Sequence, residues 1–393
     1  MVATEVAGVR AEAGEAREPA ERRGVGAAPA TFYNIAGGGN DVYWRCTGPA
    51  RAIGARVEML PAAAAAVLLM NDHDFAPFRW LPDDDLVATY PDHQGVAVWT
   101  RPCLNRAVHA TCMRLQGIRV LAEVDDNYLS DPSLNIFMRI NAYDRKAAVQ
   151  HLKAMCMHDG IVFSTGWLRD WYHRTIRQWL GKQHVPEMHV CHNAIAAADW
   201  PTPVPPRSDG RLRIGWMGSA QHVRDVKIAY PALRWAHEQG HQVVMVGHDF
   251  GDPDGVTDAK ARAWCDAWRA IIDVQVPWRR PEEYRRAALP LDIGLAPLER
   301  NVHTLGKSAV KGVEYLVSGA CFVASNVEVY RADFTHNETC LMAGSDMEML
   351  YAVQQLVKSP ALRERLTVAG QEYVRAERGD DCLRREWLAA LSA

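Results

Sequence analysis

A short stretch in the last third of the chain carries charged and polar side chains at helical spacing. Lys307, Ser308, Lys311 and Glu314 recur at three- and four-residue intervals before a glycine, after an apolar run and a loop. The pattern predicts a strand, a loop and a short helix with a glycine stop. Residues four apart lie on one helix face, so both lysines should point the same way, near an N-terminus that favours anions. The stretch therefore predicts a phosphate site, with Glu314 placed to accept hydrogen bonds from sugar hydroxyls. A solvated amphipathic helix is the alternative.

A second candidate anion site opens the second half of the chain. The segment RLRIGWMGSAQHVRD predicts a strand that reaches Gly218 and Ser219, followed by a helix that begins near His222. Backbone N–H groups at such a helix start would point at a diphosphate, and Arg224 lies one turn beyond. His222 is therefore a candidate contact to a sugar or a phosphate oxygen. The alternative is a histidine that makes only local hydrogen bonds.

Two adjacent carboxylates follow a predicted strand in the first half. Asp125 and Asp126 come one residue after the strand predicted at 118–123, and Arg101 follows the apolar run at 96–100. Ligands of parallel α/β sheets bind beyond the carboxyl ends of strands. We interpret either aspartate as a candidate to orient an acceptor hydroxyl or to take its proton. The alternative is that they cap the next turn. The spacing does not fit a DxD metal motif, so no metal site is predicted.

A glycine cluster follows the first predicted strand. Gly37, Gly38 and Gly39 come after TFYNI, and they would allow close backbone approach and expose N–H groups, as at sugar or phosphate sites of open sheets. A flexible turn is the competing interpretation.

The composition limits the class of protein. The chain has 393 residues, a net charge of −3 and nine cysteines without a CxxC pair. These values predict two or three domains, no global attraction to nucleic acid, no disulfide framework and a cytoplasmic location. The longest apolar run, 62–70, is too short to cross a bilayer. Alternating strand and helix patterns predict parallel sheets covered by helices on both faces.

Several segments together resemble GT-B glycosyltransferases, especially the retaining class grouped as family 4. The motif PL…KS…K…EYL.SG at 290–319 is similar to the nucleotide-binding signature of that class. Other similar segments occur in the order such enzymes show: VAVWTRPC (96–103), VLAEVDDNY (120–128), VFSTGWL (162–168), VCHNAI (190–195) and IGWMGSAQHVRD (214–225).

The resemblance implies roles for the candidate residues. Arg224 matches the lysine of the family's diphosphate-binding element by its spacing from Gly218, whereas Ser219 replaces the family's arginine. Some diphosphate contacts would therefore move to Lys307 and Lys311. Trp278 stands where family members read the nucleotide base, although packing is its alternative role. The implied donor-binding set is Gly218, Ser219, Arg224, Trp278, Lys307, Ser308, Lys311 and Glu314.

The sequence departs from the family pattern at two places. Family members have a second glutamate eight residues before the one that corresponds to Glu314, but this chain has Gly306 there. The family's Pro-Asn-Gly element retains only Asn193, with Asp199 as a candidate for its later part. These changes leave open which side chains contact the donor sugar.

The resemblance implies a GT-B fold of two Rossmann-like domains that face each other across a cleft. We expect a disordered tail at 1–30, an acceptor domain at 31–200, a linker at 201–210, a nucleotide-sugar domain at 211–375 and a helix at 376–393 that crosses back to the first domain. The implied donor is a nucleotide diphosphate sugar. Asp125, Asp126 and His222 are the catalytic candidates, and Gly37, Gly38, Gly39 and Arg101 are candidates on the acceptor side.

The implied function is transfer of a sugar to an acceptor hydroxyl, with retention expected and no bound cofactor or metal. The acceptor remains open between a modified DNA base, a protein, a lipid and a small molecule. Alternatives of the same fold are a nucleotide-sugar epimerase, a phosphorylase and a non-catalytic glycan- or nucleotide-binding protein. A nicotinamide-dependent enzyme fits poorly, since Gly215 and Gly218 lack the third glycine of GxGxxG.

Overall fold

The computed structural model describes residues 30–35, 43–60, 95–100, 110–111, 113–131, 134, 145–219, 222–247, 259–277 and 290–393. Nearly all of the predicted N-terminal tail lies outside these ranges. So do five of the candidate residues, namely Gly37, Gly38, Gly39, Arg101 and Trp278.

The first domain is built on a parallel six-stranded sheet in the order β2-β1-β3-β4-β5-β6. Every residue of β3, β4 and β5 is buried, as expected of a sheet that helices cover on both faces. The strands are β1 (Ala30–Ile35), β2 (Arg56–Leu60), β3 (Val96–Thr100), β4 (Val120–Val124), β5 (Gly160–Phe163) and β6 (Glu187–Val190). The helices include a π-helix, η1 (Tyr43–Thr47), then α1 (Gly48–Ile53), α5 (Arg145–Met155) and α6 (Gly166–Trp179).

The second domain has the same construction, with the order β12-β11-β10-β7-β8-β9. All of its strand pairs are parallel. The strands are β7 (Arg213–Gly218), β8 (Gln242–Gly247), β9 (Val274–Pro277), β10 (Ile293–Ala296), β11 (Cys321–Ser325) and β12 (Leu341–Ala343). The helices are α7 (Val223–Val226), α8 (Tyr230–Glu238), α9 (Ala259–Arg269), α11 (Val310–Val317), α12 (Glu328–Arg331), α13 (Asp346–Lys358) and α14 (Pro360–Glu377).

In each sheet, the strands that follow the first one in sequence are added first on one side of it and then on the other. In the second sheet, β8 and β9 follow on one side of β7, whereas β10 lies on its other side. The loops after β7 and β10 therefore leave the sheet edge in opposite directions and open a crevice between them. The first sheet has its equivalent point between β1 and β3.

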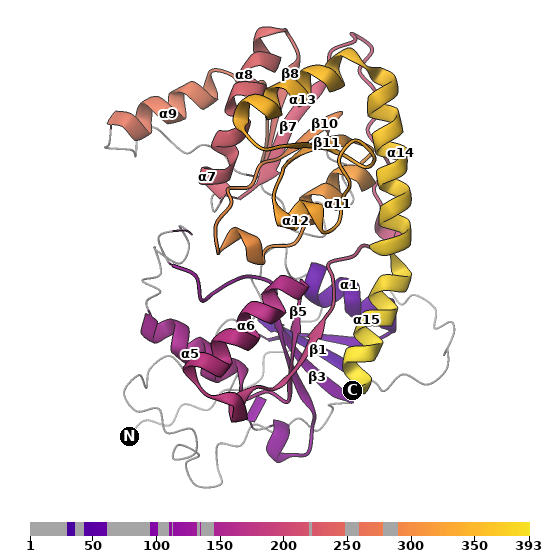
Figure 1. The fold of residues 1–393 in the computed structure, drawn as a ribbon. Helices are drawn as coiled ribbons and strands as arrows, with labels where there is room; N and C mark the ends of the chain where they lie inside the picture. Colours follow the sequence, from indigo (N-terminus) through magenta and orange to yellow (C-terminus); the bar gives the residue numbers. More distant parts are fainter. Residues whose placement is uncertain are drawn as a thin grey trace, which may run out of the picture.

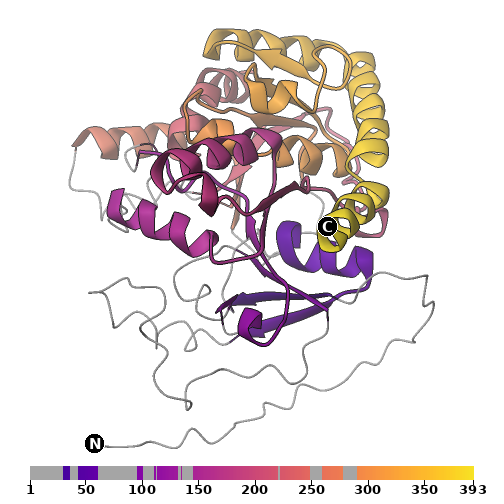
Figure 2. The same cartoon turned by 60° about the horizontal axis from the view of Figure 1, so that its bottom comes forward.

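The C-terminal helices connect the two domains. In Figure 1, α14 runs along one side of the molecule from the second domain to the first, where α15 (Asp380–Ser392) lies against α1. Figure 2 shows α15 beside α1 from a second direction. The buried face of α15 packs into the core of the first domain, and the Trp387 and Phe32 rings are 5.0 Å apart at their centroids. The last helix of the chain is thus part of the first domain's core.

Candidate active site between the two domains

Tyr315 fixes α11 beside the crevice of the second sheet. Its hydroxyl donates to the Leu295 carbonyl at 2.8 Å and accepts from the Met217 backbone N–H at 3.1 Å, so it joins β10 to β7. The ring lies against Gly294, where a Cβ atom would come within 2.5 Å of it. Only glycine allows this approach. The first turn of α11 is therefore held next to the carboxyl ends of β7 and β10.

A histidine, a carboxylate and a lysine form a hydrogen-bonded chain in that crevice. His222 Nδ1 lies 2.7 Å from Asp225 Oδ2, and His222 Nε2 lies 3.3 Å from Lys311 Nζ. The Glu299 backbone N–H donates to Asp225 Oδ1 at 2.8 Å, which ties α7 to the loop after β10. Because the carboxylate accepts, the Nδ1 atom of His222 carries the proton and Nε2 accepts from the lysine.

The electrostatic environment keeps His222 neutral and weakens the basicity of Lys311. Burial, with a further effect of Lys311, lowers the pKa of His222 to about 4. Burial, with a further effect of Lys307, lowers the pKa of Lys311 to about 8. Burial, the largest single influence, would raise the pKa of Asp225. Together with smaller effects of the Glu299 N–H and Lys311, the hydrogen bond from His222 and, once that ring is protonated in acid, its charge outweigh burial, so the pKa of Asp225 lies below its usual value. Because Lys307 disfavours the charged form of Lys311, the pair of lysines forms a site that an anion would stabilise.

The two lysines do not share a helix face, and this part of the sequence-based interpretation was wrong. Lys307 precedes α11 and has an extended backbone, with φ −75° and ψ 163°. Its Nζ atom lies 2.7 Å from Asp126 Oδ1 of the first domain, and both side chains are mostly buried. Lys311 lies inside the helix and points at His222 instead. The two ammonium groups converge through tertiary structure rather than through helical periodicity.

The loop between β10 and α11 docks onto the first domain beside this ion pair. Asn127 donates through its side-chain amide to the Val302 carbonyl at 2.9 Å, and the buried His303 lies 3.1 Å from the Ser130 hydroxyl. A Cβ atom on Gly306 would lie 3.0 Å from Asn127 Cβ and from a methyl group of Leu168. Gly306, which stands where the class that the sequence resembles has a glutamate, therefore lies at a point where the two domains touch.

Another predicted residue also contacts the opposite domain. Ser308 Oγ accepts a hydrogen bond of 2.7 Å from the Asn193 side-chain amide. Asn193 follows β6 at the carboxyl edge of the first sheet. The segment from Lys307 to Ser308 is thus held by two side chains of the first domain, one acidic and one amide.

The remaining candidates lie around this centre. Arg224 is half exposed and pairs with Glu299 at 3.1 Å, so the two flank the crevice. Gly218 ends β7, where a Cβ atom would overlap the Trp216 ring, and Ser219 follows it. Glu314 lies one turn after Lys311 on α11 and is half-buried. Asp125 Oδ1 accepts from the Tyr128 hydroxyl at 3.4 Å.

The sequence-based interpretation missed Asp225, Glu299, Asn127 and His303. Asp225 stands three residues after His222, a spacing that can be recognised on a helix. No local pattern distinguishes the other three, because their contacts are made with distant parts of the chain.

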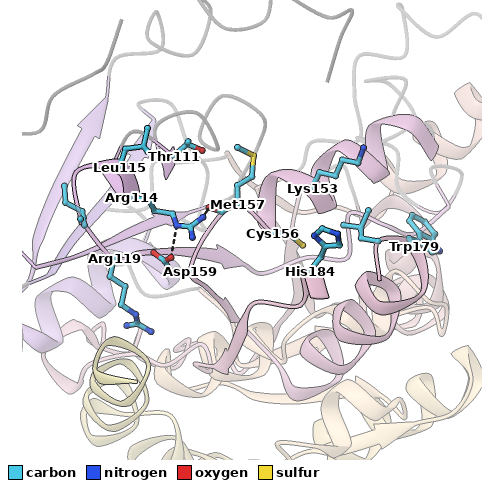
Figure 3. A pocket seen from close by; sticks show the side chains of 13 residues that line it. Thr111, Arg114, Leu115, Arg119, Lys153, Cys156, Met157, Asp159, Trp179 and His184 are labelled. Carbon is cyan, nitrogen blue, oxygen red and sulfur yellow. Dashed lines mark hydrogen bonds and ion pairs between the residues drawn. The ribbon is translucent and has the colours of Figure 1, made fainter. Parts of the chain in front are cut away.

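A separate cavity of about 1060 Å³ lies near the amino ends of the strands of the first sheet, opposite their carboxyl ends (Figure 3). Arg119 and Asp159, which directly precede β4 and β5, line it, and Asp159 pairs with Arg114 at 2.7 Å. The cavity therefore opens at the amino ends of the strands. None of the predicted site residues lines it, and we assign the candidate active site to the domain interface.

Within the described ranges, no three or more His, Cys, Asp or Glu side chains are grouped as a metal ion would require. The same ranges contain no helix with the length and apolar character that crossing a membrane demands.

Residues 232–379 match a family model described as Glycosyl transferase-like. No curated protein is significantly similar in sequence to this chain. The chain is similar in structure to Anabaena HepE in complex with UDP and glucose, with a TM-score of 0.62 at 11% identity over 93% of this chain and 99% of that one. Sucrose-phosphate synthase from Thermosynechococcus elongatus gives 0.56 at 15% identity, over 92% and 100% of the two chains. The trehalose-6-phosphate synthase OtsA gives 0.59 at 13% identity, over 93% and 99%.

These similarities confirm the predicted GT-B fold of two Rossmann-like domains. The resemblance of the second domain to glycosyltransferases is likewise confirmed, because the matched family model spans α8 to the end of α14.

Proposed function

We propose that this GT-B protein is a glycosyltransferase that moves a sugar from a nucleotide diphosphate sugar to an acceptor hydroxyl. One observation carries the proposal. Lys311 and His222 meet at the crevice between β7 and β10, and Lys307 reaches from the loop before α11 toward Asp126 of the facing domain. A cationic site in one domain thus lies opposite a carboxylate in the other.

The second domain would stabilise the leaving group. When the bond to the anomeric carbon breaks, negative charge accumulates on the diphosphate. Lys311 and Lys307 would stabilise this charge, and backbone N–H groups near Ser219 and Ser308 would add to the effect. Glu314 would accept hydrogen bonds from ribose hydroxyls. His222 is neutral and its only N–H donates to Asp225, so its Nε2 atom would accept from Lys311 or from a sugar hydroxyl and would orient that lysine toward the diphosphate.

The first domain would present the acceptor. Asp126 lies within hydrogen-bonding distance of Lys307 and could either orient the acceptor hydroxyl or take its proton. Asp125 lies beside it and is the second candidate for this role. The contact between Asp126 and Lys307 supports these roles, because transfer between two substrates bound in one cleft needs a group for the acceptor next to a group for the donor. We expect retention at the anomeric carbon, as in the class that the sequence resembles.

UDP-sugars are the donors to test first, since HepE has been crystallised with UDP-glucose as well as with UDP. Calorimetric titration of the protein with UDP-glucose, UDP-N-acetylglucosamine and GDP-mannose should identify one that binds. Lys307→Ala and Glu314→Ala should weaken that binding strongly, whereas Lys358→Ala at the end of α13 should not. Unchanged affinity in both site variants would remove the proposal.

Product analysis decides between the enzymatic alternatives. The best donor is incubated with and without candidate acceptors and followed by mass spectrometry. Transfer requires a product with one added sugar and free nucleoside diphosphate. Conversion of the donor in the absence of any acceptor would indicate an epimerase. The anomeric configuration of the product, measured by NMR, tests the expected retention.

A further inference from the structure

Arg45 is a buried cation that has no role in the sequence-based interpretation. It lies in the π-helix η1, with its side chain 1% exposed. Its Nε atom donates to Glu123 Oε1 at 2.5 Å, and its Nη1 atom donates to the Cys191 carbonyl at 2.5 Å and to Asn193 Oδ1 at 3.1 Å. Its guanidinium carbon lies 5.5 Å from the centre of the Trp387 ring. Arg45 therefore joins the end of β4, the segment after β6 and the C-terminal helix.

The hydrogen bonds beyond Arg45 have a fixed direction. A guanidinium only donates, so the atom of Asn193 that faces Arg45 must be the amide oxygen. The NH₂ group of Asn193 then faces Ser308, and it can only donate. Ser308 Oγ therefore accepts, and its own hydrogen is left to point elsewhere. No residue in the described part of the chain accepts a hydrogen bond from Ser308, so its O–H is available as a donor to a ligand.

The position of Ser308 indicates what that ligand is. The residue directly follows Lys307 and stands two residues before α11, whose first turn carries Lys311. A hydroxyl donor one residue after Lys307 and three residues before Lys311 suits an oxygen that carries negative charge. The hydrogen-bonded relay from Arg45 through Asn193 to Ser308 thus begins at a buried cation of the first domain and ends at a hydroxyl in the lysine-bearing segment of the second.

The elements around Arg45 support a role that spans both domains. Tyr43 and Trp44, its predecessors on η1, pack into the hydrophobic cluster of the second domain. Cys46, which follows it, packs into the core of the first domain. The π-helix thus anchors to both domains, and π-helical turns are frequent at functional sites.

We propose that Arg45 is a positioning residue for donor binding, which acts through Asn193 to keep the Ser308 hydroxyl oriented as a donor to the diphosphate. The inference rests on the proposed function. It requires that the affinity for UDP depend on the direction of the Asn193–Ser308 hydrogen bond. A purely structural role of Arg45 would not produce this dependence.

Asn193→Asp tests that direction with almost no change of shape. The new carboxylate still accepts from Arg45, but it can only accept from Ser308, so it would turn the hydroxyl away from the ligand. We expect Asn193→Asp to weaken UDP binding about tenfold more in a protein that retains Ser308 than in one that carries Ser308→Ala. This difference corresponds to one hydrogen bond to a charged group. The repulsion by the added charge is common to both backgrounds and cancels. Gln178→Glu, on an exposed part of α6, is the charge control.

UMP serves as the second probe, because it lacks the β-phosphate. We expect the difference between the two Ser308 backgrounds to be smaller with UMP than with UDP. Equal losses of UDP affinity in both backgrounds would overturn the inference while leaving the proposed function intact. If the unaltered protein binds none of UDP, GDP and ADP, the proposed function and the inference both fail.

Arg45→Lys tests the origin of the relay. Lysine keeps a positive charge near Glu123 but lacks the planar fork that reaches two acceptors. We expect Arg45→Lys to weaken UDP binding about fivefold. In a protein that already carries Asn193→Ala, the same substitution should cause no further loss of affinity, because the side chain through which Arg45 acts is gone. An equal loss in both Asn193 backgrounds would overturn the role of Arg45. Thermal denaturation of each variant verifies folding, and the Asn193 and Ser308 variants decide the inference if Arg45→Lys does not fold.

Discussion

The carboxyl edges of the two sheets differ in charge although their backbones follow the same plan. Both sheets are parallel and six-stranded, with a reversal next to their first strand. The edge of the second sheet carries Lys311, Lys307 and a neutral histidine, whereas the edge of the first carries Asp125 and Asp126. The repeated backbone supplies two equivalent crevices, and the side chains decide what each one binds.

The edges meet at the Lys307–Asp126 ion pair. A phosphate that binds to Lys307 would compete with Asp126 for the same ammonium group. The cationic edge and the acidic edge are therefore coupled, so that a change on one side should alter the behaviour of the other. The following predictions test this division of roles, beginning with the largest effect.

Lys311→Ala should remove the centre of the cationic edge. We expect activity to fall by about 10² to 10³-fold, the usual effect of removing one preorganised donor to a developing charge. Steady-state kinetics with the best donor measure the loss. Lys311→Arg keeps the charge and should retain much of the activity, and Lys358→Ala is the control for loss of a lysine. A loss below threefold in Lys311→Ala would contradict the assignment of this edge to the diphosphate.

Asp126→Asn should separate binding from turnover. Lys307 loses its competing partner, so the KM for the donor should fall by a few-fold, while kcat should fall by about 10²-fold because the acceptor hydroxyl loses its carboxylate. Asp125→Asn serves as the neighbouring comparison and should reduce kcat less. An unchanged kcat in Asp126→Asn would place the acceptor carboxylate elsewhere.

Donor affinity should depend on pH through Lys311. The pKa of this group is lowered to about 8 in the free protein, and a bound diphosphate would raise it. Affinity for UDP should therefore be highest below pH 8 and fall by up to about tenfold per pH unit above it, as the ammonium group loses its proton. Calorimetry in buffers of different ionisation enthalpy should show proton uptake on binding near pH 8. Lys311→Arg should abolish this pH dependence and the uptake, and their persistence in that variant would assign them to another group.

Arg224→Ala should have the smallest effect. Its side chain is 51% exposed and pairs with Glu299, and exposed ion pairs contribute only about 0.2–1 kcal/mol. We expect the donor KM to rise about threefold at low ionic strength and less at high ionic strength. A loss as large as that of Lys311→Ala would show that Arg224 binds the diphosphate directly when the donor is present.

Some of the site could be predicted because its signals are local. The glycine stop of α11 is one example, since Gly319, which follows the C-cap residue Ser318, has φ +84°. The start of that helix was harder to place. Ala309 occupies the capping position without a side-chain hydrogen bond, so no residue type marks the boundary that leaves Lys307 outside the helix.

The sequence by itself determined the two parallel sheets, the strand ends that carry Gly218 and the aspartates, and the helix that carries Lys311 and Glu314. These features follow from hydrophobic periodicity, which local burial imposes on the chain. Only the tertiary structure decided that Lys307 pairs with Asp126, that Asp225 orients His222 toward Lys311, and that Arg45 reaches Asn193. Two of these three contacts join segments more than a hundred residues apart, and the third pair faces Lys311 from another element. The docking of the domains sets the first contact, the folding of α11 onto the second sheet sets the second, and the packing of η1 within the first domain sets the third. No local periodicity records any of these arrangements.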